Sequence, residues 1–213
     1  MHRTLVTAAL GAAMLVPAAA GAQDIEHRGV RLGGHLALGL AGELDAYIND
    51  SGTEVDLEPS VGFELRAEVP VLDFLVVGGS FGFLSVEAEP SPWTGAWERE
   101  ETFSFSGYVR GRWVFEAIRS TLFVEPYVLV PLGFTMAVLP DGGRDDEIWP
   151  GWNTGVLFGA QLLHRSGFGG YVEMGWRHAE VYREQATIFG TADLSLVLNE
   201  MALSFGFVYV LGA

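Results

Sequence analysis

The feature that most constrains this chain is an alternation of large apolar residues with small or polar residues, which recurs in eight segments. A period of two is typical of a β-strand, whose successive side chains point to opposite faces. The segments cover residues 30–40, 57–69, 75–86, 103–116, 122–138, 152–163, 168–177 and 197–211. After residue 22, no uncharged apolar run reaches the roughly 18 residues that a membrane helix requires. The sequence therefore predicts an all-β chain with eight antiparallel strands.

The charged residues within these segments indicate which face points where. In the first, second, fourth, fifth and seventh segments, ten charged residues lie opposite the large apolar residues: Arg31, Glu64, Arg66, Glu68, Arg110, Arg112, Glu116, Glu125, Glu173 and Arg177. A membrane barrel turns its apolar face outward to lipid, whereas a soluble barrel turns that face inward. The size of the apolar face favours an eight-stranded antiparallel transmembrane up-and-down β-barrel, with a soluble periplasmic lipocalin-like binding barrel as an alternative. Leu84 and Val86 break the alternation and predict a β-bulge.

The segments that connect the strands alternate in length. Links near 70–73, 117–121 and 164–167 are short, and links near 42–55, 87–101, 139–151 and 179–195 are long. Short periplasmic turns and long external loops are expected of an outer-membrane barrel with both termini in the periplasm.

The N-terminus predicts export. His2 and Arg3 precede an apolar stretch, and Ala20-Gly21-Ala22 supplies the small-residue pattern that a signal peptidase recognises. We expect a signal peptide over residues 1–22 and an outer-membrane β-barrel domain over 23–213. A retained membrane helix is the alternative for the first segment.

Composition excludes several classes of function. The absence of cysteine excludes disulfides and cysteine-ligated metals, and no cofactor is expected. A formal net charge of −15, with every basic residue an arginine, argues against nucleic acid as a partner.

The last third of the chain resembles a known family. Gly151-Trp152-Asn153 and the run from Tyr171 to His178 look like the final hairpin region of the small outer-membrane β-barrel proteins, the OmpA-like and OmpW-like superfamily. The resemblance implies a monomeric barrel that contacts outer-membrane lipid and lipopolysaccharide and is inserted by the barrel-assembly machinery. The chain departs from that family at its end, Leu211-Gly212-Ala213, where an aromatic residue is usual.

The charges that face inward are expected to pair. Eight strands enclose a lumen just wide enough for side chains to fill it, and unpaired charges there would be costly. Arginine suits such pairing because its guanidinium binds carboxylates bidentately. We therefore expect a salt-bridged plug, with an ion or proton path as the alternative.

Aromatic and acidic residues are expected near the membrane surfaces. The expected interface girdle comprises Trp93, Trp97, Trp113, Trp149, Trp152, Trp176 and Tyr209. Acidic residues gather in the long links. The simpler interpretation is a rim of carboxylates exposed to solvent, and the alternative is that these carboxylates bind divalent cations. Loop tryptophans can also bind partners.

No motif indicates an enzyme. An HExxH motif and a phosphate loop are both missing from the sequence. The region around His178 resembles the outer-membrane lipid A deacylases, but the serine expected two residues later is replaced by Glu180. We therefore expect a non-enzymatic barrel for envelope integrity or surface interaction, with a narrow channel for small apolar molecules as the alternative.

Overall fold

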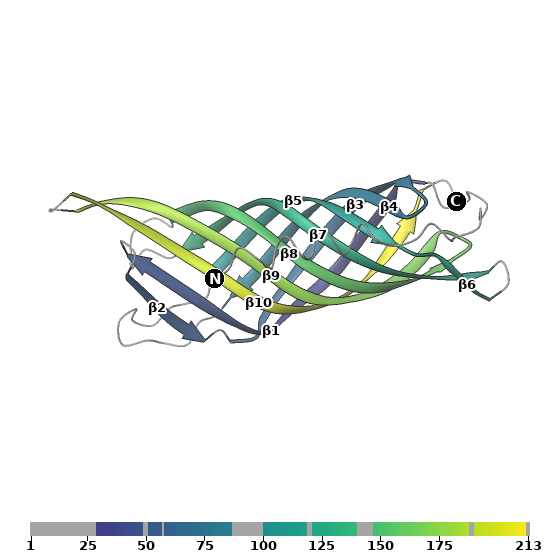
Figure 1. Ribbon diagram of the computed structural model, residues 1–213, viewed down its shortest axis with the longest axis horizontal. Coiled ribbons are helices and arrows are strands. Elements are labelled where there is room, and N and C mark those ends of the chain that lie inside the picture. Colours follow the sequence, from purple (N-terminus) through teal and green to yellow (C-terminus); the bar gives the residue numbers. More distant parts are fainter. Residues whose placement is uncertain are drawn as a thin grey trace.

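The chain forms a closed ring of β-strands. The computed structural model describes residues 29–48, 51–56, 58–86, 100–118, 121–139, 147–187 and 190–211. Its strands are β1 (Arg31–Ile48), β2 (Ser51–Asp56), β3 (Ser60–Leu72), β4 (Leu75–Val86), β5 (Glu100–Arg112), β6 (Phe115–Ile118), β7 (Leu122–Leu139), β8 (Glu147–His164), β9 (Phe168–Thr187) and β10 (Gly190–Val210). Eight of them pair antiparallel in the order β1-β3-β4-β5-β7-β8-β9-β10, and β10 pairs with β1 to close the barrel (Figure 1). The predicted eight-stranded up-and-down barrel is confirmed.

The alternation in the sequence sets the two faces of the barrel wall. On β7, Val130, Leu132 and Phe134 are exposed on the outer face, and Leu132 is 66% exposed. Leu129, the residue before Val130, is buried on the inner face. This arrangement contradicts the soluble lipocalin-like alternative. A soluble barrel turns its apolar residues inward and its charged residues outward, whereas here the apolar residues face outward and the charged residues face inward. No helix in the described part of the chain is long and apolar enough to cross a membrane.

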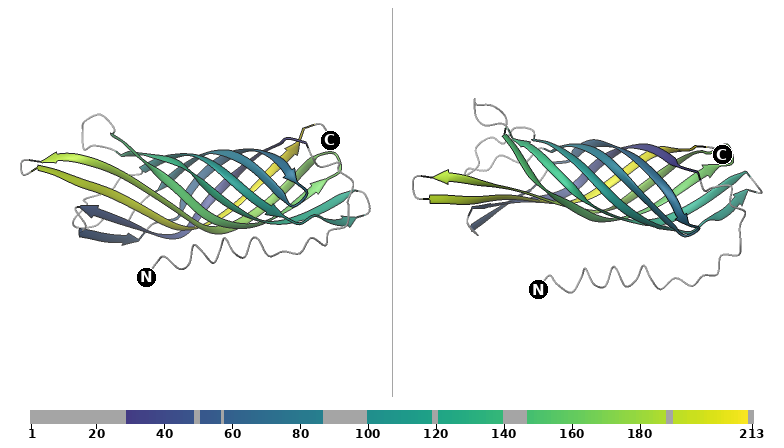
Figure 2. Two further views of the ribbon diagram at one scale, coloured as in Figure 1. Left: turned by 45° about the horizontal axis from the view of Figure 1, so that its top comes forward. Right: turned by 90° about the horizontal axis from the view of Figure 1, so that it is seen from above.

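Two of the predicted long links are strands for most of their length. Residues 43–48 of β1 pair with β2 on one side and with β10 on the other. The β9–β10 hairpin continues its pairing as far as Thr187 and Gly190. The prediction that 42–55 and 179–195 are loops was therefore wrong. These strands extend the wall on one side, and the hairpin projects beyond the rest of the barrel (Figures 1 and 2).

The bulge predicted at Leu84 and Val86 is not observed, and the register shifts lie in other strands. β4 pairs with β5 without a register shift from Leu75 to Val86, so Leu84 and Val86 continue the inward parity that Val76 begins. The main irregularity interrupts the pairing of β1 with β10 between Gly39 and Ala41. The extra residue there changes the parity of β1, which turns Leu44 inward although Leu38 and Leu40 belong to the outer face. A second shift lies in β3 between Pro70 and Leu72.

The fourth predicted strand divides in two. β5 ends at Arg112, and Trp113 and Val114 separate it from the short strand β6. β6 pairs only with the start of β7, off the closed ring. It lies at the end of the barrel where β1 begins and β10 ends, called here the terminus end; the opposite end is called the hairpin end (Figure 1).

Candidate functional site

The inner face of the barrel carries the charged residues in two clusters. The first, at the terminus end, is built around Glu125, which is fully buried. Arg31 binds both of its oxygens at 2.7 and 3.1 Å, and Arg112 Nη1 lies 3.2 Å from Glu125 Oε2. Arg110 Nη2 lies 3.2 Å from Glu68 Oε2 and 3.8 Å from Glu125 Oε2. Three guanidinium groups and two carboxylates therefore fill this end of the lumen.

The second cluster occupies the middle of the barrel. Arg66 donates two hydrogen bonds to Glu173, at 2.8 and 2.6 Å, and also contacts Glu64, its neighbour on the inner face of β3. The Tyr127 hydroxyl donates to Glu173 at 2.9 Å. His35 Nδ1 lies 2.8 Å from the Tyr171 hydroxyl. The arginine thus holds one carboxylate across the lumen and another on its own strand.

Tyrosine rings fill the space between the charges, and glycines on adjacent strands make room for them. Gly159 is registered opposite Tyr127, and a Cβ at Gly159 would lie 2.4 Å from the Tyr127 ring. Gly78 stands in the same relation to Tyr108. The guanidinium of Arg110 lies 4.8 Å from the centre of the Tyr127 ring, within the range of a cation–π contact.

The ten predicted lumen charges fall into three groups. Seven are buried: Arg31, Arg66, Glu68, Arg110, Arg112, Glu125 and Glu173. Glu64 and Arg177 are half-buried on the inner face, with Arg177 Nη2 4.0 Å from Glu64 Oε2. Glu116 is exposed on β6, so the prediction that it faces the lumen was wrong. The strand break at residues 113–114 ends the parity from which Glu116 was placed.

Sequence reasoning missed a different inner carboxylate. Glu200, on β10, is 4% exposed. Ser60 donates a hydrogen bond to its Oε2 at 3.1 Å, and the same oxygen lies against Gly39, where a Cβ would be 2.4 Å away. The signal was available, because Glu200 shares the parity of Ser204 and Gly206 on a strand with an apolar outer face.

A cavity of about 80 Å³ lies above the central cluster, towards the hairpin end. Glu64, Arg66, Arg177 and Glu200 contribute to its polar side, and Leu129, Leu157 and Leu198 contribute to its apolar side. A second, smaller cavity of about 30 Å³ is lined almost entirely by apolar side chains such as Leu44, Val181 and Leu196. Thr102, Thr135, Ala179 and Leu198 line both cavities.

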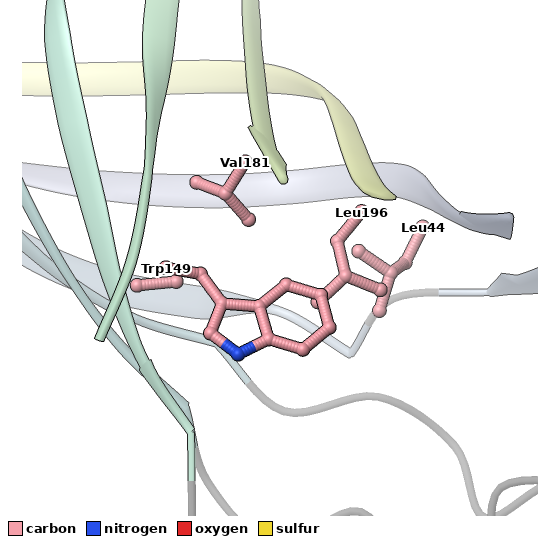
Figure 3. Close-up of a cluster of buried hydrophobic side chains, with 5 residues drawn as sticks. Leu44, Trp149, Val181 and Leu196 are labelled. Carbon is pink, nitrogen blue, oxygen red and sulfur yellow. The ribbon is translucent and has the colours of Figure 1, made fainter. Parts of the chain in front are cut away.

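Trp149 lies inside the barrel near this second cavity. Its side chain is 9% exposed and packs in a cluster with Leu44, Ala137, Val181 and Leu196 (Figure 3). The prediction that Trp149 belongs to the outward girdle was wrong, because strand β8 places it on the inner parity with Leu157 and Leu163.

The other predicted girdle residues have different positions. Trp152, Trp176 and Tyr209 are exposed on the outer face, and Trp152 donates to Glu180 at 3.0 Å. Trp113 is half-buried between β5 and β6. Trp93 and Trp97 lie outside the described residues, as does the predicted signal peptide.

The histidines show no catalytic arrangement among the described residues. His178 Nδ1 lies 2.8 Å from Asn199 Oδ1, next to Trp152 and Trp176 on the outer face. His164 Nδ1 lies 2.9 Å from Ser166 Oγ within one exposed turn. The described side chains also form no group of three or more His, Asp or Glu arranged for a metal ion. The absence of enzymatic activity stays a prediction.

Comparison with known proteins identifies the fold. No family model matches the sequence, and no curated protein matches it. The outer membrane protein OprG from Pseudomonas aeruginosa matches in structure with a TM-score of 0.50 and 10% identity, over 89% of this chain and all of that chain (100%). Neisserial surface protein A matches with a TM-score of 0.49 and 16% identity, over 85% of this chain and 97% of that chain.

An outer membrane protease is also among the structural matches, with a lower score. OmpT from Escherichia coli has a TM-score of 0.34 and 10% identity, over 84% of this chain and 96% of that chain. A score this low carries no argument about activity. The resemblance to the OmpA-like and OmpW-like superfamily stays a prediction. By its closed ring of eight strands and its likeness to OprG, the chain has the fold of the small outer-membrane β-barrels.

Proposed function

We propose that this chain is an integral outer-membrane protein, exported through a cleaved signal peptide, whose lumen is closed to flow and which acts at the outer surface. The exposed apolar wall supports insertion into lipid, because an outward apolar band is what the hydrocarbon region requires. Both described chain ends lie at the terminus end with the short turns, which in this proposal faces the periplasm (Figure 1). The protein is monomeric and reaches the membrane through the barrel-assembly machinery.

The single observation that carries the closed lumen is the cluster around Glu125. Arg31 and Glu125 are both fully buried, and Arg110 and Arg112 are no more than 4% exposed. Three arginines joined through one carboxylate leave little room for water at the terminus end, as expected for an eight-stranded barrel whose side chains fill it.

The extension at the hairpin end supports action at the surface. Strands β2, β1, β10 and β9 pair side by side there. Their exposed carboxylates include Glu43, Glu54, Asp56, Glu184 and Asp193. We infer a role in envelope integrity or surface interaction, in which divalent cations join this acidic sheet to the phosphates of lipopolysaccharide.

A second candidate is a narrow channel for small apolar molecules. The observation that favours it is the pair of adjoining cavities in the hairpin half, one of them lined by Leu44, Val181 and Leu196. The charged cluster around Glu125 lies between these cavities and the terminus end.

Membrane fractionation and current measurements test the proposal. We expect the protein in the outer-membrane fraction, with faster migration on a gel unless it is boiled, and no steady current in a planar bilayer. Recovery in the soluble periplasmic fraction would overturn the membrane assignment. A steady current would replace the closed barrel with the channel.

A further inference from the structure

Strand β2 forms an open edge of the sheet at the hairpin end. Residues 51–56 pair with residues 43–48 of β1, and no other described strand pairs with β2 (Figure 1). β3 takes over the same side of β1 only from Ser60, and β4 accompanies β3 no further than Ser85, opposite Val61. The outer edge of β2 therefore presents backbone N–H and C=O groups that no described strand satisfies.

This edge lacks the usual features that keep a further strand from adding to a sheet. Natural edge strands are commonly protected by lysine, by proline or by a β-bulge. Residues 51–56 contain neither lysine nor proline, and their pairing with β1 runs without a register shift. An extended segment can therefore add to β2 through main-chain hydrogen bonds.

The carboxylates beside the edge determine which charge such a segment carries. Glu54 and Asp56 are exposed on β2, and Asp45 and Glu43 lie directly opposite them on β1. All four are on the outer face, because Leu44 between the two β1 carboxylates is buried on the inner face. Like charges directly opposite each other destabilise a strand pair. Since no arginine in the described part of the chain forms an ion pair with these four carboxylates, a basic segment would supply the charge that this sheet lacks.

The opposite edge of the same sheet has a different character. The pairing of β9 with β8 ends at Val181, so residues 182–187 form a second edge. Arg183 and Glu184 are adjacent there, and the charges of this edge are therefore mixed. A basic partner is favoured at β2 and not at β9.

We propose that β2 binds a basic, extended peptide segment of another protein, which adds to the sheet as a strand along residues 51–56. The backbone of the segment pairs with the open edge, and arginine or lysine at alternate positions faces Glu54 and Asp56. The side chains between them turn to the inner face, on which β1 carries Leu44. The inference names a partner for the proposed surface interaction. It rests on that proposal for its orientation, because an external partner reaches β2 if the hairpin end faces outward.

Binding of a synthetic peptide to the purified protein in a neutral detergent tests this edge. The probe is a fluorescently labelled heptapeptide of alternating valine and arginine, followed by anisotropy in EDTA so that divalent cations do not occupy the carboxylates. We expect the double variant Glu54→Gln, Asp56→Asn to weaken binding at least tenfold. The matched control is Glu184→Gln, Asp193→Asn, which removes another directly opposed pair from the same sheet. It is expected to bind the peptide within twofold of the parent.

A second peptide separates strand addition from attraction between opposite charges. It has the same sequence with a methyl group on every peptide nitrogen, so it keeps its positive charges but donates no backbone hydrogen bonds. We expect it to bind at least tenfold more weakly than the first peptide. Equal binding of the two peptides would overturn strand addition.

The remaining outcomes decide the location and the partner. Failure of the parent to bind the first peptide, or equal binding by the parent and the Glu54→Gln, Asp56→Asn variant, would overturn the site. A parent that is dimeric without peptide, and whose dimer the peptide dissociates, would assign the edge to a second copy of this chain. The variants change exposed side chains, and faster migration of the unboiled protein on a gel shows that each has folded. None of these outcomes changes the membrane assignment or the closed lumen, which are judged by fractionation and current.

Discussion

Neutralising Glu125 should destabilise the barrel more than removing any one of the arginines that contact it. The cluster at the terminus end holds three arginines and two glutamates, so it carries one positive charge in excess. Glu125→Gln raises that excess to two and leaves Arg31, which is fully buried, without a carboxylate. Breaking a buried pair in this way costs about 3–5 kcal/mol. Arg31→Met instead brings the cluster to neutrality and keeps the aliphatic volume, so we expect a smaller loss.

The double variant separates charge from packing. Arg31→Met with Glu125→Gln returns the excess to one positive charge, so it should be more stable than Glu125→Gln alone, with a favourable coupling of about 0.5–3 kcal/mol. The assay is urea unfolding of the protein folded into lipid vesicles, followed by tryptophan fluorescence. Glu116→Gln, exposed on β6, should stay within about 0.5 kcal/mol of the parent. If Glu125→Gln proves as stable as the parent, or the double variant loses the full sum of the single losses, the charge argument is refuted.

Three further predictions concern packing and orientation. Val130→Arg places a charge on the outer face near the middle of β7 and should cost about 2–4 kcal/mol in the same urea assay, whereas Val130→Leu should be tolerated. Gly159→Ala should lower the urea midpoint because its Cβ would meet the Tyr127 ring. Gly170→Ala should not, because its Cβ would lie 3.5 Å from the nearest atom, the Gly206 carbonyl oxygen, which is an ordinary contact distance. In variants that keep a single tryptophan, brominated lipid should quench Trp152 and Trp176 strongly and Trp149 weakly; strong quenching of Trp149 would place it on the outer face.

The face that each strand residue occupies could be predicted from the sequence, because contact with lipid or with the lumen constrains each residue separately. Each residue of a membrane barrel wall faces either lipid or lumen, and a period of two records that choice along every strand. Strand β3 illustrates this alternation. Phe63 and Leu65 face lipid, and Glu64 and Arg66 face the lumen. The ring of eight follows from counting such segments.

The errors arose where one residue changes the parity. The bulge at Leu40 inserts a residue into β1, after which the inner positions change from odd to even numbers. Such a shift has no signature in an alternation of Ala, Gly and Leu, so Leu44 could not be placed. The strand break at Trp113 had the same effect on Glu116. Trp149 was assigned to the interface because it fell in the predicted link 139–151, whereas β8 begins at Glu147 and so gives Trp149 an inward strand position.

The bulge also explains why the lumen has two chemically different halves. Below it, β1 directs Arg31 and His35 inward, where they meet carboxylates from β7 and β9. At the bulge, Gly39 leaves space that the Glu200 carboxylate occupies. Above it, the changed parity turns Leu44 towards Val181, Leu196 and Trp149. One inserted residue therefore separates a charged, closed half from an apolar half, and Glu200 lies at the boundary between them.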